Sequence, residues 1–301
     1  MGSLAFPHLQ QEPLSKHTTF RIGGPAEIFA LPKTKEDLFA IGKFLHNSGK
    51  SYFLLGKGSN VLASDDGFQG VVICTDALEP FLEFLPDGCV RASASSPNAR
   101  LLRACAEQGL GGIEYLSGVP GNLGGAVFMN AGTSSGWIEQ ALESVEVVGL
   151  EGAARTIYKK QLQFSYREQH FLRPGEVIVA ATLKLNPEPR ETVLPRLAEA
   201  SRKRKEAQPI ELPSCGSVFR NPPNTSAWKL IHEVGLKGHQ VGGARFHPKH
   251  CNFITNEGGA TQKDVLTLIQ LAKEKVLQQT GVSLQEEVIL IKPKWLNKNS
   301  A

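Results

Sequence analysis

The first candidate for chemistry is a short glycine-rich loop, Gly56-Lys57-Gly58-Ser59-Asn60, which follows the apolar run 52–55. Glycines let backbone N–H groups come close to a phosphate, and consecutive N–H groups form a nest for an anion. The loop is not a dinucleotide fingerprint, because Val61 stands where GxGxxG needs a glycine, and the chain contains no GxxxxGK[ST] motif. Taken alone, the loop is equally compatible with an ordinary turn between two strands.

A second glycine-rich stretch runs from Ser117 to Ala126 and leads into the segment 129–132. It is dominated by small residues, yet Val119, Leu123 and Val127 can anchor it to a core. A flexible linker would lack these anchors and would favour serine and other polar residues. We therefore expect a rigid backbone surface for a large anionic ligand. Two such loops in one chain predict a dinucleotide that is bound outside the Rossmann framework.

The basic run, the cysteines and two histidines are further candidates for chemistry. The basic run Arg202-Lys203-Arg204-Lys205 is expected to be a solvated helix face or linker, with attraction of an anionic substrate as the alternative. The five cysteines are odd in number and form no CxxC pair, which argues against a disulfide framework and a typical zinc site. His247 and His250 have no carboxylate close in sequence, so no metal site is predicted.

The composition limits the class of protein. The 301 residues carry a net charge of +4, with 41% apolar and 21% charged residues, as in globular proteins. These values exclude a disordered chain, and a net charge of +4 spread over 301 residues is not the footprint of a nucleic-acid partner. No signal peptide is found at residues 1–9, and no apolar run is long enough for membrane insertion. Together with the cysteine content, this predicts a cytoplasmic protein.

The elements that must position the two loops fall into three parts of the chain, 1–80, 81–193 and 194–301. In the first part, Thr34 and Asp37 match a capping box before an amphipathic helix. Apolar runs at 52–55 and 71–74 predict strands around this helix, and hence a small α/β unit.

The second part is expected to begin with a helix over 98–110 and to end in strands. Glu151-Gly152 lies between two apolar runs and predicts a hairpin. Alternating residues over 177–185 predict a long strand that the prolines in 186–189 break.

The third part is expected to start with a charged helix before Gln208-Pro209. Thr261 and Asp264 match a second capping box, and apolar residues at helical spacing follow it. The last element expected in the third part is a strand over 288–291.

Six segments follow one another in a fixed order over nearly the whole chain: 18–26, 55–60, 118–132, 216–222, 229–238 and 249–254. Together they resemble the motifs of the UDP-N-acetylenolpyruvoylglucosamine reductase family. Each glycine loop alone is weak evidence, whereas the ordered set is specific. The segment between Arg167 and Ser217 is too short for the tyrosine-bearing loop of one branch, so the resemblance is to the shorter branch. This branch would need another lid over the substrate.

The resemblance implies an α+β flavoenzyme with three domains. A two-part FAD-binding region of the PCMH type would occupy 1–80 and 81–193, and a separate α/β substrate domain would occupy 194–301. NADPH would reduce bound FAD, which would pass hydride to the enolpyruvyl group of UDP-N-acetylglucosamine enolpyruvate. The product would be UDP-N-acetylmuramate, a peptidoglycan precursor. The expected partners are this small-molecule UDP-sugar and NADPH.

The resemblance also implies roles for individual residues. Arg167 and Glu287 would stabilise the enolate-like intermediate, and Ser217 would donate the proton. Taken alone, Arg167 would more often form a surface ion pair, Glu287 would be a charge at a strand start, and Ser217 would be a turn residue. Their places within the ordered motifs favour the functional roles instead. The residues implied in FAD binding are Gly56, Lys57, Gly58, Ser59, Asn60, Gly118, Pro120, Gly121, Gly124, Gly125 and Asn130; those implied near the substrate diphosphate are Asn221, Lys229 and Lys249.

The chain departs from the family pattern at two places. Gln169 stands where the family usually has a serine, and Phe246-His247-Pro248 replaces a segment that often contains one. These departures leave the reaction class intact and change the expected local geometry.

Two other functions are compatible with parts of the pattern. An FAD-dependent oxidase or dehydrogenase on the same scaffold would act on an alcohol or a sugar acid and would ignore NADPH. The serine motif and Glu287 argue against it. A non-catalytic sensor of a nucleotide sugar or flavin would not need the set Arg167, Ser217 and Glu287, which is complete here.

Overall fold

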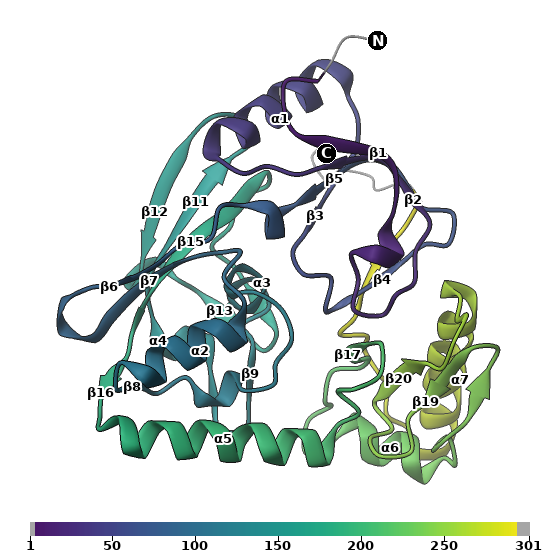
Figure 1. Cartoon of the computed structure of the whole chain (residues 1–301). Helices are drawn as coiled ribbons and strands as arrows, with labels where there is room; N and C mark the ends of the chain where they lie inside the picture. Colours follow the sequence, from purple (N-terminus) through teal and green to yellow (C-terminus); the bar gives the residue numbers. More distant parts are fainter. Residues whose placement is uncertain (1–3, 294–301) are drawn as a thin grey trace.

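The computed structural model describes residues 4–293, and its first sheet lies at the top of the molecule in Figure 1. Its order is β1-β2-β5-β3, with bounds His8–Pro13, Pro25–Ala30, Phe68–Cys74 and Tyr52–Leu55. β2, β5 and β3 are parallel, and β1 is antiparallel to β2. Helix α1 (Lys35–Ser48) begins at the predicted capping box of Thr34 and Asp37. The predicted α/β unit is therefore present.

The second sheet is antiparallel and has the order β12-β11-β15-β7-β6. Its strands are Ala154–Tyr158, Leu142–Gly149, Glu176–Lys184, Cys89–Ser93 and Leu82–Phe84. The predicted hairpin at Glu151-Gly152 is confirmed, since Gly152 N donates to Gly149 O at 2.9 Å. The predicted long strand is β15.

Helices of the second part flank the second glycine loop. They are α2 (Asn98–Glu107), α3 (Leu123–Phe128) and α4 (Ile138–Ala141), and α3 packs on β15 and β7. α2 ends before the predicted residue 110, because Gly109 takes the left-handed conformation with φ 66°. The expected break at 186–189 is confirmed: β15 ends at Lys184, and β16 (Asn186–Pro187) belongs to another sheet, where it forms a short edge pair with β8 (Leu110–Gly111). Proline is tolerated at such an edge.

The third part begins with the charged helix α5 (Arg190–Ala207), which runs along the bottom of Figure 1 and packs on α2. The sheet that follows has the order β17-β20-β19-β18 and the bounds Ser214–Ser217, Phe253–Asn256, Ala244–Phe246 and Gln240–Val241. Helices α6 (Ala227–Glu233) and α7 (Gln262–Thr280) complete the unit. The capping box of Thr261 and Asp264 is confirmed at the start of α7.

The last strand leaves the third part. β21 (Ile289–Ile291) pairs in parallel with β4 (Val61–Ala63) of the first part. The remaining elements are β9 (Gly132–Thr133), β10 (Gly136–Trp137), β13 (Phe164–Ser165), β14 (Glu168–Gln169) and the 3-10 turns Leu14–Lys16, Thr75–Ala77, Pro86–Gly88, Glu114–Leu116 and Lys159–Gln161.

The largest core joins the first two parts. Leu38 and Ile41 of α1 are fully buried in the same cluster as Val145 of β11. Gly42 permits this approach, since a Cβ there would lie 1.7 Å from Leu150 O. A second cluster fills the third part. The ranges 1–80, 81–193 and 194–301 remain a proposed division into domains, and the second boundary falls inside α5.

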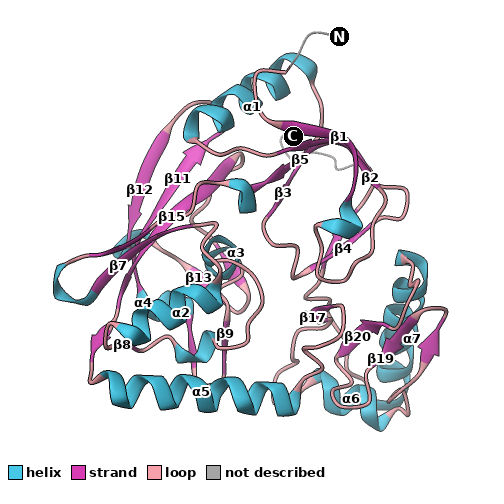
Figure 2. Cartoon of the chain, in the orientation of Figure 1, coloured by secondary structure: helices cyan, strands magenta, loops and turns pink. Residues whose placement is uncertain are grey.

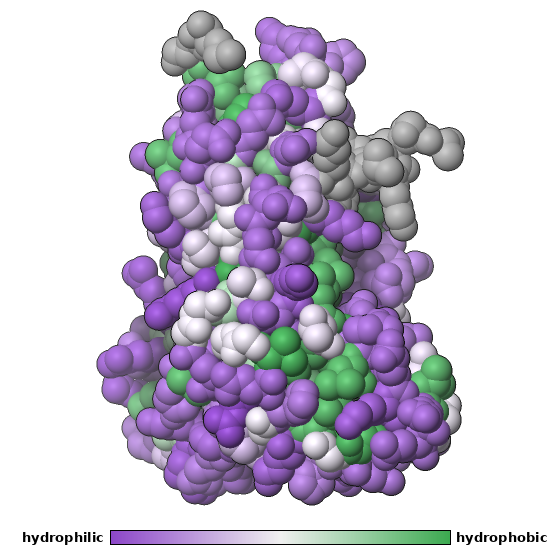
Figure 3. All heavy atoms as spheres, turned by 90° about the vertical axis from the view of Figure 1, so that its right-hand side faces the viewer, coloured by the Kyte–Doolittle hydropathy of each residue, from purple (hydrophilic) through white to green (hydrophobic). Residues whose placement is uncertain are grey.

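Helices and strands alternate irregularly in all three parts, as expected for an α+β chain (Figure 2). Seen from the side of α7, the surface is mostly hydrophilic, with apolar patches in its lower half (Figure 3). Within residues 4–293, no helix has the length and the apolar run that crossing a membrane requires.

Candidate active site

The two glycine loops lie against each other. Ser59 Oγ of the first loop donates to Pro120 O of the second at 3.1 Å. Asp76 bridges them as well: its carboxylate accepts from Lys57 Nζ at 2.9 Å and from Asn122 Nδ2 at 2.5 Å. The structure therefore brings together two loops that are separated by about 60 residues in the sequence.

The paired loops have the chemistry of an anion cradle. Within the described part of the chain, the backbone N–H groups of Gly58, Ser59 and Asn60 have no hydrogen-bond acceptor. Unpaired backbone donors beside left-handed glycines fit phosphate groups. The residues present thus fit the diphosphate of a bound FAD.

Two asparagines that the sequence assigned to FAD binding use their side chains elsewhere. Asn60 Nδ2 donates to Glu287 O at 3.1 Å. Asn130 is 2% exposed, and its Nδ2 donates to Glu139 Oε2 at 2.9 Å and to Ser165 O at 3.1 Å. Both side chains therefore connect the cradle with segments that carry the predicted catalytic residues.

Arg167 lies at the tip of a hairpin formed by β13 and β14. Its φ of 61° is left-handed, which costs a residue other than glycine about 1–2 kcal/mol. Its Nε lies 3.0 Å from Glu287 Oε1, and the two side chains are only 19% and 12% exposed. The Arg167 Nε–H is not aligned with an acceptor in residues 4–293, so this close approach is not a directed hydrogen bond.

Ser217 ends β17, on the strand beside the segment that carries Glu287. Gly216, with φ 75°, accompanies a register shift between Ser214 and Ser217. The next residue, Val218, accepts from Glu287 N at 2.8 Å. Thr19 Oγ1 donates to Ser214 O at 2.7 Å, and Thr19 N donates to Gly58 O of the first loop at 3.0 Å. The three predicted catalytic residues thus converge beside the cradle.

Burial controls the ionisation of Glu287. Removal from water raises the pKa of its carboxyl, while the positive charges of Arg167 and Arg220 oppose this rise. The net direction is upward. A carboxyl in this state can keep its proton and donate a hydrogen bond.

Comparison with known proteins identifies the family. Residues 26–157 match an FAD binding domain, and residues 208–291 match the UDP-N-acetylenolpyruvoylglucosamine reductase, C-terminal domain. The chain is 39% identical, over 96% of its length, to the UDP-N-acetylenolpyruvoylglucosamine reductase of Geotalea uraniireducens, of which the match covers 94%. It is also 39% identical, over 93% of its length, to that of Moorella thermoacetica, of which 92% is covered. The chain belongs to the UDP-N-acetylenolpyruvoylglucosamine reductase family.

A solved structure of the same family supports the architecture. The crystal structure of UDP-N-acetylenolpyruvylglucosamine reductase (MurB) from Thermus caldophilus matches with a TM-score of 0.81 and 38% identity, over 95% of this chain and 100% of the other. The predicted family and the α+β fold with an FAD-binding region and a separate C-terminal domain are therefore confirmed. The chain is an oxidoreductase with an FAD-binding domain.

The three residues predicted near the substrate diphosphate, Asn221, Lys229 and Lys249, all belong to the third part of the chain. Asn221 Oδ1 accepts from Ala227 N at 3.0 Å, at the start of α6. Lys229 Nζ lies 5.8 Å from the ring centre of Trp228. Lys249 Nζ donates to Lys205 O at 3.2 Å, so it reaches the last turn of α5. Asn221 contacts the β13–β14 hairpin directly, because its N–H donates to the Tyr166 hydroxyl at 3.4 Å.

The two departures from the family pattern form local turns. Gln169 Oε1 accepts from Phe171 N at 3.0 Å and from Leu172 N at 2.9 Å. These bonds form a turn directly after the β13–β14 hairpin. His247 Nδ1 accepts from Lys249 N at 3.1 Å. Both side chains thus take part in shaping the backbone.

Arg204 was missed by the sequence analysis, which treated its basic run as solvated. Arg202 does face water and pairs with Glu199 and Glu206. Arg204 turns inward, and its Cδ lies 2.6 Å from where a Cβ on Gly118 would be. Burial, with a smaller effect of Arg167, lowers the pKa of Arg204 to about 10, and its buried Nε has no acceptor among residues 4–293.

A helical pattern could have revealed Arg204. It lies seven residues after Leu197, which packs on the core, and eleven after the buried Val193. This spacing places all three on the inner face of α5. Arg204 could therefore offer a charge to an anionic group beside the second loop.

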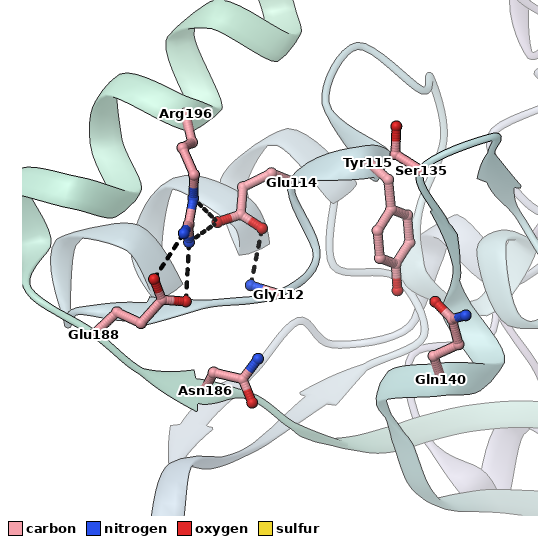
Figure 4. A pocket seen from close by; sticks show the side chains of 8 residues that line it. All are labelled: Gly112, Glu114, Tyr115, Ser135, Gln140, Asn186, Glu188 and Arg196. Atoms are coloured by element: carbon pink, nitrogen blue, oxygen red, sulfur yellow. Dashed lines mark hydrogen bonds and ion pairs between the residues drawn. The ribbon is translucent and has the colours of Figure 1, made fainter.

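A polar pocket of about 340 Å³ opens between α5 and the β9–β10 hairpin (Figure 4). Its guanidinium, Arg196, is already held by Glu114 and Glu188, with contacts of 2.7 Å to each. Since these two carboxylates satisfy the charge, we assign no anion-binding role to this pocket.

Proposed function

We propose that this chain reduces the enolpyruvyl group of UDP-N-acetylglucosamine enolpyruvate to UDP-N-acetylmuramate, with NADPH as the reductant. Family membership and the FAD-binding domain support the reaction class. The observation that carries the proposal is the buried Arg167–Glu287 pair, 3.0 Å apart, beside Ser217 and the two-loop cradle. The cytoplasmic location predicted from the sequence belongs to the same proposal.

The cradle would hold FAD through Gly58, Ser59, Gly121 and their backbone N–H groups. FAD, when bound there, supplies a two-electron carrier that NADPH can reduce and the enolpyruvyl substrate can oxidise. Lys229, Lys249 and Asn221 would bind the substrate diphosphate, since lysines suit phosphate as point charges.

Arg167 would bind the substrate carboxylate. As hydride adds to the terminal carbon of the enol ether, negative charge develops on the carboxylate side of the substrate. A guanidinium that is held in place before the reaction stabilises that charge without reorganisation. Protonated Glu287 would donate a further hydrogen bond to the same charge.

Ser217 would then give its hydroxyl proton to the carbon beside the carboxylate, which completes the saturated product. The serine alkoxide regains a proton from water. An unactivated serine is a weak acid, so the basicity of the substrate enolate must drive this transfer.

Ser217→Ala separates the two half-reactions. We expect anaerobic flavin reduction by NADPH to keep its rate, whereas oxidation of the reduced enzyme by the enolpyruvyl substrate slows about 100-fold or more, as for loss of a general acid. Stopped-flow absorbance measures both steps. Ser214→Ala, in the same strand, is the control. If Ser217→Ala oxidises at the rate of the unaltered enzyme, Ser217 is not the proton donor.

A further inference from the structure

Trp137 lies directly against the catalytic hairpin. Its ring centre is 5.0 Å from Arg167 Cζ, and its ring meets the Tyr166 ring at 5.5 Å in an edge arrangement of 79°. One indole therefore contacts both residues of the hairpin turn. Trp137 lies 30 residues before Arg167 in the chain and belongs to none of the predicted catalytic motifs.

The backbone of Trp137 is held on both sides by hydrogen bonds. Trp137 O accepts from the Tyr115 hydroxyl at 2.9 Å, and Trp137 N donates to Gln140 Oε1 at 3.1 Å. Tyr115 and Gln140 both line the pocket of Figure 4. Gly132 leaves room for the ring, because a Cβ there would be 2.9 Å from Trp137 Cε3. The backbone that carries the indole is thus tied down, and the ring lies close against Gly132 on one side and the hairpin turn on the other.

The same segment ties down the hairpin strand. Asn130, at the start of the segment, donates to Ser165 O, and Glu139, at its end, holds the Asn130 side chain. Residues 130–139 therefore support the hairpin through a hydrogen bond to β13 and through aromatic contacts at the turn.

On the basis of the proposed function, we propose that Trp137 is a positioning residue that fixes the Arg167 guanidinium for the substrate carboxylate. Besides the ring of its neighbour Tyr166, whose centre lies 5.5 Å from Arg167 Cζ, Arg167 has a strained backbone and an unaligned contact with Glu287. Neither feature fixes the rotation of its guanidinium plane. An aromatic face attracts the cation and excludes water on one side, which limits that rotation. The ends of the guanidinium remain available for a carboxylate.

The test compares Trp137→Leu with Trp137→Phe in the FAD-loaded enzyme. Leucine retains apolar volume and removes the aromatic face, whereas phenylalanine keeps an aromatic face. We expect Trp137→Leu to slow oxidation of the reduced flavin by the enolpyruvyl substrate about tenfold, a typical worth of a partly buried cation–π contact. Flavin reduction by NADPH should be unchanged, and Trp137→Phe should restore most of the lost rate.

Tyr158→Leu is the control for loss of a surface aromatic residue, since Tyr158 is 64% exposed and lies on β12. The inference is overturned if Trp137→Leu oxidises at the unaltered rate. It is equally overturned if both half-reactions and the melting temperature fall together and phenylalanine rescues neither, because that marks a merely structural role. If the unaltered enzyme is not oxidised by the substrate at all, the proposed function itself fails.

Discussion

Glu287 is the residue on whose ionisation the proposed reaction depends most. Its side chain is 12% exposed. Burial favours the neutral form of the carboxyl, whereas the charges of two arginines favour the ionised form. Burial prevails, so the pKa of Glu287 is raised. The carboxyl therefore keeps its proton to a higher pH than a free glutamate, and loses it as the pH rises through the raised pKa.

A pH profile tests this assignment. We expect the rate of substrate reduction to fall as the pH rises through the pKa of Glu287, because the ionised carboxylate can no longer donate to the substrate. Glu287→Gln keeps a donor that does not ionise, so this limb of the profile should disappear in the second half-reaction. Glu286→Gln is the matched control, since Glu286 pairs with Lys273 at 3.0 Å outside the site. A limb that persists in Glu287→Gln belongs to another group.

Sequence motifs predicted Arg167, Ser217 and Glu287, but not the contacts that hold the β13–β14 hairpin, and Asn130 was predicted only for FAD binding. The motifs are local strings, whereas Trp137 and Asn130 act on the hairpin through contacts across 29–35 residues. Arg204 escaped notice for another reason. Its neighbours in the basic run are solvated, and only its position on the inner face of α5 distinguishes it.

At the scale of elements, the FAD cradle depends on the close approach of two loops. Gly121 has a φ of 117°, and a Cβ there would lie 2.9 Å from Ser59 Oγ. Any side chain at this position must therefore strain its backbone and displace the hydroxyl that joins the loops.

Gly121→Ala is expected to weaken FAD binding about tenfold, since it opens the cradle as well as straining the backbone at a cost of about 1 kcal/mol. Flavin fluorescence during titration of the apoprotein with FAD measures the affinity. Gly49→Ala adds a Cβ at a φ of 63° with no atom within 4 Å and far from the loops, so it isolates the backbone strain. Equal FAD affinity in the two variants would contradict the cradle.

Elements with local signals were predicted well. The capping boxes at Thr34 and Thr261 fixed the starts of α1 and α7, because a cap depends on residues only three positions apart. Pairing between distant strands has no such signal. The closing strand was predicted, but its partner β4 was not, because that pairing joins residues more than 220 positions apart.

At the scale of the whole molecule, the first and third parts are joined by a strand pair and by contacts at the start of a helix. Besides the β21–β4 pair, the Asp65 carboxylate accepts from Gln262 N at 2.9 Å and from Lys263 N at 3.4 Å, at the start of α7. A carboxylate suits the unpaired N–H groups and positive dipole of a helix start. This contact lies beside a groove of about 640 Å³ between residues 64–66 and α7.

Asp65→Ala should lower the free energy of unfolding by about 1 kcal/mol, the usual effect of losing a helix cap. Chemical denaturation followed by circular dichroism measures the change. Asp66→Ala removes the neighbouring acid, for which residues 4–293 contain no hydrogen bond or ion pair from the side chain to α7. An Asp65→Ala protein as stable as the Asp66→Ala protein would show that this junction adds nothing to the fold.

The central claim is that one chain carries electrons from NADPH to an enolpyruvyl UDP-sugar through bound FAD. The visible absorption spectrum of the purified protein, without oxygen, tests it most directly. We expect flavin bands that bleach when NADPH is added and return when UDP-N-acetylglucosamine enolpyruvate follows. Bands that bleach but do not return with this substrate would contradict the proposed function, and their absence after reconstitution with FAD would contradict the cradle as well.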